Sequence, residues 1–309
     1  LLQQGHKVRV YEQAGEVSEV GAAVQMSANA VKVLYQLGLK NTLEQHAVKP
    51  ESFQFLRYDT GEMLHLIVLG AEHEKRHGHP YYQIHRVDLH QGLLKAVMAL
   101  DPHAVVLGKR AKSVTEDANQ ASAVMYYMRG GKVLNFVGCV ERPWEEESWT
   151  SRKPWSELSA DYEGWHPMVR APIEAADKDQ CFRWALNNRK PVMTWSTARV
   201  ALLGDAVHAT LPYMAQGAAM AIEDAAILSR ALALDAPLNE RLSIYEKHRA
   251  PRAARVVNES TEMAELYHIA DAGQMKQAFK DRNIAASRNN WLYPYNPWTV
   301  DIERPFEGV

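Results

Sequence analysis

Residues 200–230 combine a carboxylate with the start of a helix in an order that could bind a ligand. The apolar run 200–203 predicts a short buried strand, and Gly204 and Asp205 follow at its carboxyl end. From Gly217 onward, apolar residues recur at helical spacing. Ligands of α/β folds bind at the carboxyl ends of strands and the amino ends of helices. Asp205 could therefore accept hydrogen bonds from ligand hydroxyls, and the helix start would offer N–H groups and partial positive charge.

The full run from Gly204 reads G-D-A-x-H-x-x-x-P-x-x-x-Q-G-A-x-x-A-I-E-D-A, which is more specific than the Gly-Asp pair. It resembles the second FAD-binding motif of the single-component aromatic hydroxylases, flavoprotein monooxygenases of the salicylate, 3-hydroxybenzoate and 6-hydroxynicotinate hydroxylase type. In that family the aspartate holds the ribityl chain, the proline loop passes beside the isoalloxazine, and the next helix points at the flavin pyrimidine. The resemblance gives these roles to Asp205, Pro212, and Gly217 with Ala218. An ordinary strand–turn–helix without a ligand is the alternative.

Three other stretches resemble parts of the same family that contact FAD. Glu12 ends an alternating run where the ribose-binding acid of a dinucleotide site would stand, although on spacing alone a solvated strand end is the alternative. Residues 21–30 resemble the family's G-A-G-I-Q-L-x-P-N-A segment, which implies that Val24 and Gln25 lie beside the isoalloxazine; a polar group capping backbone is the alternative for Gln25. Arg86, in an R-x-D-L, matches the arginine that contacts the pyrophosphate, with pairing to Asp88 or a nearby acid as the alternative.

Gln216, Gln25 and His208 are the candidates for catalytic contacts with substrate or flavin. The resemblance implies that NADH or NADPH reduces FAD and that O₂ then supplies an oxygen atom to a small hydroxylated aromatic acid. A base or acceptor near the ring would help, because a deprotonated phenol is a better nucleophile. His208 could titrate near neutral pH, and a structural hydrogen bond beneath the proline loop is the alternative.

The resemblance implies an α/β fold with a Rossmann-like FAD-binding domain, an inserted β-sheet substrate domain (the PHBH-like fold) and a long C-terminal helix. We expect residues 1–118 and 191–309 to form the FAD-binding domain and residues 119–190 the substrate domain. The family's glycine fingerprint and its G-A-D-G motif have no counterpart in the sequence. We expect that the sequence omits segments of a longer protein, one of them near 119–125, because a dinucleotide site without its first strand would leave a sheet edge open.

Composition and charge narrow the class of protein. The 309 residues include 35 basic and 37 acidic side chains, so no global field favours nucleic acid or an anionic membrane. Cys139 and Cys181 are too few for a disulfide framework and lack metal-site spacing, so we expect no metal and a reducing compartment. No apolar run reaches the roughly 18 residues of a membrane span. We therefore expect a cytoplasmic enzyme, and a homodimer is the family's common state.

The remaining elements follow from periodicity. We expect hairpins over 52–68 and 125–140 and a long amphipathic helix from 237 to about 268, whose arginines pair with acids. Residues 73–79, which are rich in histidine and charge, predict a solvated loop. Two alternatives to an aromatic hydroxylase remain: a related FAD oxidoreductase or epoxidase with a larger, non-aromatic substrate, and a degenerate flavoprotein that serves as a binding module.

Overall fold

The computed structural model describes residues 1–12, 23–107, 122–140, 151–269, 271–304 and 306. Its α-helices are α1 (Ala28–Gln36), α2 (Lys40–His46), α3 (Gly70–His77), α4 (Arg86–Leu100), α5 (Trp155–Asp161), α6 (Pro167–Ala175), α7 (Asp205–His208), α8 (Gly217–Leu232), α9 (Leu238–Tyr267), α10 (Ala272–Arg282) and α11 (Ile284–Ser287). Four short helices of other types are η1 (Leu2–Gln4), η2 (Arg129–Gly131), η3 (Pro212–Met214) and η4 (Arg288–Leu292).

The described strands form five pairs, four of them antiparallel. The pairs are β1 (Val10–Tyr11) with β6 (Val105–Val106), in parallel; β2 (Ala23–Met26) with β5 (Tyr82–His85); β3 (Ser52–Leu56) with β4 (Met63–Val68); β7 (Ser122–Met128) with β8 (Val133–Cys139); and β9 (Ser151–Arg152) with β10 (Phe182–Arg183). The hairpins expected over 52–68 and 125–140 are thus confirmed as β3–β4 and β7–β8.

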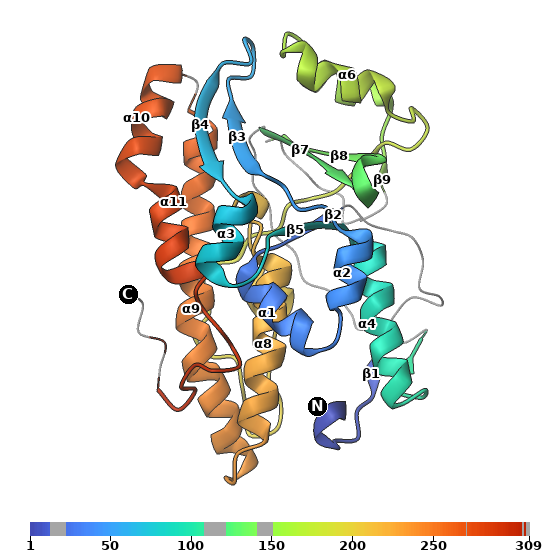
Figure 1. The fold of residues 1–309 in the computed structure, drawn as a ribbon, viewed down its shortest axis with the longest axis vertical. Helices are drawn as coiled ribbons and strands as arrows, with labels where there is room; N and C mark the ends of the chain where they lie inside the picture. The colour runs from blue at the N-terminus through green and yellow to red at the C-terminus, as the bar shows by residue number, and fades with distance from the viewer. Residues whose placement is uncertain (13–22, 108–121, 141–150, 270, 305, 307–309) are drawn as a thin grey trace.

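Helices α8 and α9 run side by side through the molecule and carry the main core (Figure 1). α1 packs against α8 on one side, while α10 and α11 extend the α9 side, and α10 also packs against β4. The β2–β5 pair contacts α8, α1, α2 and the β7–β8 hairpin, so it lies between the helices and the far hairpin. This central position makes β2 and the start of α8 neighbours.

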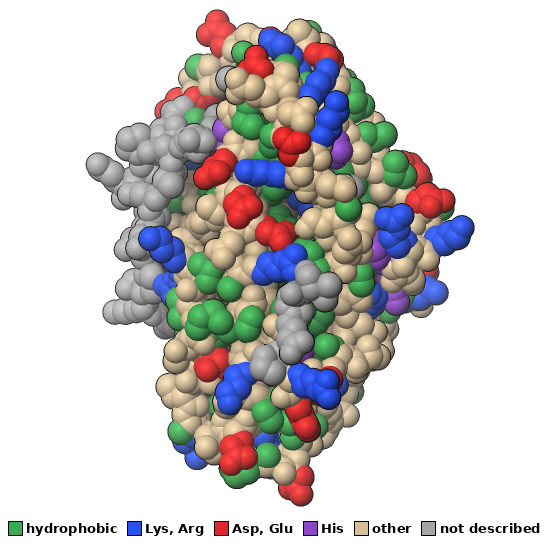
Figure 2. Space-filling model, turned by 90° about the vertical axis from the view of Figure 1, so that its left-hand side faces the viewer, with side chains coloured by type: hydrophobic (Ala, Val, Ile, Leu, Met, Phe, Trp, Pro, Cys, Tyr) green, Lys and Arg blue, Asp and Glu red, His purple; other side chains and the backbone are tan. Residues whose placement is uncertain are grey.

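The surface and the helices agree with the balanced charge of the sequence. On the face that α9 and α10 present, acidic and basic side chains are interspersed, without a large area of one sign (Figure 2). No helix in the described part of the chain is both long and apolar enough to cross a bilayer.

The buried strand predicted over 200–203 is wrong. Val200 is 60% exposed and Leu202 and Leu203 are each 40% exposed. The run instead turns back on the residues before it, since the Leu202 amide donates to the Trp195 carbonyl at 2.8 Å. A single bridge, from Ser196 to Ala201, is its only strand-like pairing in the described structure. An apolar run predicts burial only when other elements cover it, and none of the described strands does.

The solvated loop predicted over 73–79 is also wrong in part, because helix α3 extends to His77. His73 and His77, one helical turn apart, are 4% and 7% exposed. Their rings pack edge-to-face on Tyr293, at 5.0 and 5.4 Å between centroids. Burial lowers the pKa of His73 to about 4, so the ring is neutral at physiological pH. The charged residues between the two histidines are exposed, which hides this buried face in the composition.

Two acids of α8 face two arginines of α9 in the core. Arg249 donates to Asp224 and Glu223 at 2.7 Å each, and Arg252 donates to both carboxylate oxygens of Glu223 at 2.7 and 2.9 Å. All four side chains are at most 1% exposed. Burial alone would raise the pKa of Glu223 and of Asp224, but the guanidiniums of Arg252 and Arg249 hold both below their ordinary values. The expectation that the arginines of this helix pair with acids is confirmed.

The same network fastens two further segments to α8 and α9. Asn29, in the first turn of α1, donates to Glu223 at 2.6 Å. Arg252 also donates to the backbone carbonyls of Trp291 and Leu292, at 3.3 and 3.1 Å. We use the name "buried ion network" for Asn29, Glu223, Asp224, Arg249 and Arg252. Its geometry fixes how α1, α8, α9 and η4 lie together.

Replacement of one network member should strongly destabilise the fold. We expect Arg249→Met to lower the free energy of unfolding by about 3–5 kcal/mol, because it leaves the buried carboxylate of Asp224 without its arginine and removes one of the two arginines of Glu223. The matched control is Lys40→Met, which removes a half-exposed ion pair with Glu44 and should cost less than about 1 kcal/mol. Urea denaturation followed by circular dichroism measures both. Equal effects for the two variants would contradict the importance of the buried ion network.

Candidate functional site

The start of α8 is open toward a ligand. Gln216 is the N-cap residue, and no side chain caps the first-turn amides. Gly217 is half-buried and Ala218 is exposed. Free N–H groups at the amino end of a helix carry partial positive charge, and they bind anions and electron-rich oxygens. The predicted pair Gly217 and Ala218 therefore stands where it could hold an electron-rich group.

Gln216 itself is buried and turned into the protein. Its amide nitrogen donates to the Ser27 hydroxyl at 3.1 Å, and its amide oxygen accepts from Asn29 at 3.2 Å. Asn29 also accepts from the Ser27 hydroxyl at 2.6 Å. These bonds tie the N-terminus of α8 to that of α1 and link it to the buried ion network. The geometry favours a positioning role for Gln216, and its contact with substrate stays a prediction.

Gly204 and Asp205 form the turn into α7. Gly204 has φ 61° and ψ −149°, a combination open only to glycine, and its amide donates to Asp224 at 2.9 Å. The carboxylate of Asp205 is exposed and has no hydrogen bond or ion pair within the described residues. Pro212, which opens η3, is exposed as well. Asp205 is thus free to accept hydrogen bonds from a ligand's hydroxyl groups.

His208 hydrogen-bonds the same carboxylate that receives the Gly204 amide. Its Nε2 lies 2.6 Å from Asp224, and its side chain is 3% exposed. The ring also packs on Trp195, with centroids 5.4 Å apart. Asp224 therefore positions the Gly204 turn, α7 and Arg249 together. This arrangement favours the structural role for His208.

Val24 and Gln25 lie on β2, opposite Ile84 and Gln83 of β5. The Gln25 side chain accepts a hydrogen bond from the Tyr81 hydroxyl at 2.8 Å, and it also hydrogen-bonds Tyr126 of β7. Burial raises the pKa of Tyr126 to about 12, so its hydroxyl keeps its proton at neutral pH. Gln25 thus connects β2 to the β7–β8 hairpin through side chains.

Arg86 opens α4 directly after β5 and is exposed. The alternative in which Arg86 pairs with Asp88 is wrong, because Asp88 receives two hydrogen bonds from Arg129, at 3.0 and 3.1 Å. Arg86 makes no ion pair within the part of the chain that the structure describes. Since its neighbour His85 lies opposite Ala23, strand pairing brings Arg86 close to the start of β2.

Glu12 lies apart from these residues in the strand framework. It follows β1, and its amide donates to the Val106 carbonyl at 2.9 Å. It is half-buried and has an interacting partner. Its position at the end of a parallel strand agrees with the expected place for a ribose-binding acid, while the role itself stays a prediction.

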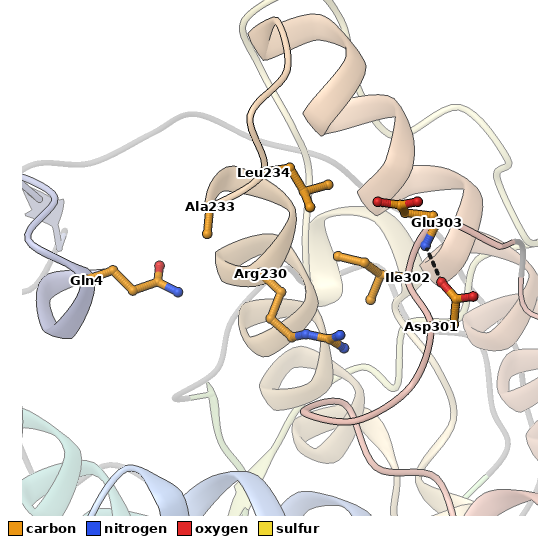
Figure 3. Close-up of a pocket in the computed structure, with 7 residues that line it drawn as sticks. All are labelled: Gln4, Arg230, Ala233, Leu234, Asp301, Ile302 and Glu303. Carbon is orange, nitrogen blue, oxygen red and sulfur yellow. Dashed lines mark hydrogen bonds between the residues drawn. The ribbon is translucent and has the colours of Figure 1, made fainter.

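A hollow of about 350 Å³ lies at the opposite end of α8 from these residues (Figure 3). Its lining is Gln4, Arg230, Ala233, Leu234, Asp301, Ile302 and Glu303. Arg230 donates to the Pro297 carbonyl at 2.7 Å, and Asp301 accepts from the Glu303 amide at 3.1 Å. Arg230 thus holds the C-terminal segment, while Gln4 accepts a hydrogen bond from Ser229 of α8. The hollow lies at the far end of α8 from Gly217, so it does not belong to the candidate site.

Comparison with known proteins identifies the class that this fold and site define. A family model described as an FAD binding domain matches residues 134–260. The chain is 31% identical to a 6-hydroxynicotinate 3-monooxygenase of Pseudomonas fluorescens, over 83% of this chain and 84% of the relative. It is 29% identical to a 3-amino-4-hydroxybenzoate 2-monooxygenase of Streptomyces platensis, over 96% and 91% of the two chains.

A solved structure shares the fold. The complex of Klebsiella pneumoniae HpxO with FAD and uric acid has a TM-score of 0.71 and 19% identity, covering 91% of this chain and 89% of that one. The prediction of an α/β, PHBH-like fold is confirmed. The protein is a flavoprotein monooxygenase, and it belongs to the family of FAD-dependent aromatic hydroxylases. FAD is its cofactor, and NADH or NADPH is the typical co-substrate of the family.

The alignments also bear on the missing motifs. The alignment with the Pseudomonas relative spans 328 positions, and that with the Streptomyces relative spans 367, both more than the 309 residues of the chain. These relatives therefore carry stretches without a counterpart here. That one such segment falls near 119–125 stays a prediction, and these positions lie mostly outside the described residues.

Sequence reasoning missed several residues that build the site. Asn29, Glu223 and Asp224 stood in the quoted motifs without an assigned role, although the spacing of Arg249 and Arg252 on one helical face was a signal for acidic partners. Tyr81 carried no signal, because its contact with Gln25 joins segments 56 residues apart in sequence.

We predict that His208 stabilises the fold through its hydrogen bond to Asp224 and takes no part in catalysis. In His208→Gln the amide nitrogen can still donate to Asp224, so we expect the stability, the FAD content and the pH dependence of turnover to stay close to wild type. His208→Ala removes a hydrogen bond to a buried charge and should cost about 1.5–3 kcal/mol of stability. Thermal unfolding and a pH–rate profile test this. Loss of a titration step in a well-folded His208→Gln enzyme would show that His208 is catalytic instead.

Proposed function

We propose that this protein is an FAD-dependent monooxygenase that hydroxylates a small hydroxylated aromatic acid, with NAD(P)H and O₂ as co-substrates. The observation that supports this most is the 31% identity, over most of both chains, to an enzyme named for a hydroxylated aromatic acid, 6-hydroxynicotinate. Bound FAD would take a hydride from NAD(P)H and activate O₂, chemistry that amino-acid side chains do not supply. The protein's part is to bind, orient and polarise.

The start of α8 supplies the electrostatic part of this function. The amides of Gly217 and Ala218 have no capping side chain, so they can donate to the flavin pyrimidine. Because the amino end of a helix carries partial positive charge, it would stabilise negative charge on the reduced ring. The buried ion network holds this helix end in place before any ligand arrives, which avoids reorganisation during the reaction.

The other predicted residues would contact the remaining parts of FAD. Asp205, exposed and without a protein partner in the described structure, would hold the ribityl hydroxyls, and Pro212 would pass beside the ring. Arg86 would pair with the pyrophosphate and Glu12 with the adenosine ribose. Val24 would lie beside the isoalloxazine, and the turn at Gly204 would orient Asp205 toward the cofactor. The residues present thus fit FAD.

We also propose the family's division of the chain: residues 1–118 and 191–309 as the FAD-binding domain and 119–190 as the substrate domain. The substrate would then lie between β2 and the β7–β8 hairpin, the two elements that Gln25 and Tyr126 connect. Two free cysteines agree with a cytoplasmic location, since reducing compartments keep thiols reduced. We also propose that the protein forms a homodimer.

The purified protein should be yellow, and a phenolic acid should accelerate its oxidation of NADH with uptake of O₂. Spectrophotometry at the NADH band, an oxygen electrode and mass spectrometry of the product measure this. The expected product is the substrate with one added hydroxyl group on the ring. A denatured extract without flavin would overturn the proposal, and an epoxidised or saturated product would favour the related oxidoreductase with a non-aromatic substrate.

Asp205→Ala should weaken FAD binding about 10- to 100-fold, because it removes charge-assisted hydrogen bonds worth about 1.5–3 kcal/mol. Flavin content after gel filtration and fluorescence titration of the apoprotein measure the effect. Asp179→Ala is the control, because Asp179 is an exposed aspartate of the proposed substrate domain with no predicted contact to FAD. This variant should keep full FAD content. Normal flavin retention by Asp205→Ala would remove this carboxylate from the site.

A further inference from the structure

The buried charges do not balance among the residues that the structure describes. In the described residues, the buried ionic side chains other than histidine are four cations and two anions: Lys32, Arg249, Arg252, Arg288, Glu223 and Asp224. The two anions are taken by Arg249 and Arg252. Two buried cations, Lys32 and Arg288, therefore remain without an acidic partner in the described part of the chain.

Lys32 is solvated by the protein itself. Its ammonium donates to the carbonyls of Tyr293, Pro294 and Tyr295, at 3.0, 3.0 and 3.4 Å. Three carbonyls match the three N–H groups of an ammonium. Lys32 therefore has no unused donor to offer a ligand.

Arg288 is different. It is 5% exposed, and its guanidinium donates to the Tyr213 carbonyl at 3.3 Å. The hydroxyls of Tyr267 and Tyr293 also accept from the guanidinium, but its Nε–H is buried without a partner in the described structure. Burial opposes the charged form, yet the pKa of Arg288 lies above its ordinary value, in part because the Tyr267 hydroxyl accepts a hydrogen bond from it. The side chain is a permanent cation with neutral partners and an unused donor.

Arg288 also lies at the candidate site. Tyr213, whose carbonyl it binds, follows Pro212 in η3. The ring of Tyr293 packs edge-to-face on Tyr81, 6.3 Å between centroids, and Tyr81 donates to Gln25. Arg288 therefore contacts the proline loop directly, and two buried tyrosines, Tyr293 and Tyr81, separate it from Gln25. A guanidinium without an acidic partner among the described residues thus lies against the loop that would pass beside the flavin ring.

We propose that Arg288 binds the carboxylate of the aromatic acid substrate, an assignment that rests on the proposed function. A carboxylate can accept from Nε and a terminal nitrogen of the guanidinium together, in the bidentate geometry that only arginine offers. It would satisfy the orphan Nε–H and compensate the buried charge. The tyrosine rings around Arg288 would cover the aromatic ring. Arg288 thereby selects acids over uncharged phenols.

The test compares a phenolic acid with its carboxamide and with the phenol that lacks the carboxyl group. Binding is measured from the perturbation of the flavin spectrum, so it does not depend on turnover. We expect Arg288→Met to weaken binding of the acid about 100-fold or more and to leave the carboxamide and the phenol within a fewfold of wild type. Arg288→Lys should lie between the two, since it keeps the charge and loses the bidentate fork. Arg282→Met, at an exposed arginine of α10, is the matched control and should behave as wild type.

Unchanged affinity of Arg288→Met for the acid would overturn the assignment, as would an equal loss for acid, carboxamide and phenol. A second measurement needs no variant: wild-type protein should bind the acid at least about 100-fold more tightly than the carboxamide. Equal affinities would overturn the assignment even if the variants fail to fold. If wild type hydroxylates a phenolic acid but shows neither the preference for the acid nor the effect of Arg288→Met, the assignment of Arg288 is wrong and the proposed function stands. If wild type binds no aromatic compound, the proposed function fails and the assignment with it.

Discussion

The contact between Glu223 and Asp224 of α8 and Arg249 and Arg252 of α9 is the interaction on which the rest of the structure depends. These charges are buried, so each must find its partner within the protein, and the geometry that satisfies all of them is narrow. Asp224 reaches the Gly204 turn and His208, and Glu223 reaches Asn29 at the start of α1. The elements that would surround the flavin are therefore fixed to one another by charge, behind the surface that the flavin would touch.

This arrangement separates positioning from contact. The residues that could meet the cofactor, Asp205, Gly217, Ala218 and Arg86, are exposed or half-exposed and have few partners of their own. The residues that hold them in place, such as Asp224 and Arg249, are buried and hydrogen-bond to one another. Such a division suits a cofactor enzyme, because flavin supplies the chemistry and the protein has to present dipoles and donors in a fixed orientation. A buried polar network is costly when one member is lost, so it also makes the site sensitive to distant substitutions.

The sequence predicted the elements whose pattern is local. Helices α8 and α9 and the hairpins β3–β4 and β7–β8 follow from periodicity, and the motif around Asp205 led to the correct family. Residues 200–203 were mispredicted because burial depends on which elements cover an apolar run. His73 and His77 were misplaced because exposed charges between them dominate the composition. The unmatched charge of Arg288 could not be seen in the sequence, since it depends on which acids the fold brings near each arginine.

The account's central claim is that the ion-anchored start of α8 presents its amides to the flavin. A crystal structure of the FAD-loaded protein tests this most directly. The account predicts that a pyrimidine oxygen of the flavin accepts a hydrogen bond of about 2.9 Å from the amide of Gly217 or Ala218, with the Asp205 carboxylate on the ribityl chain. A flavin bound elsewhere, with both groups facing solvent, would contradict it.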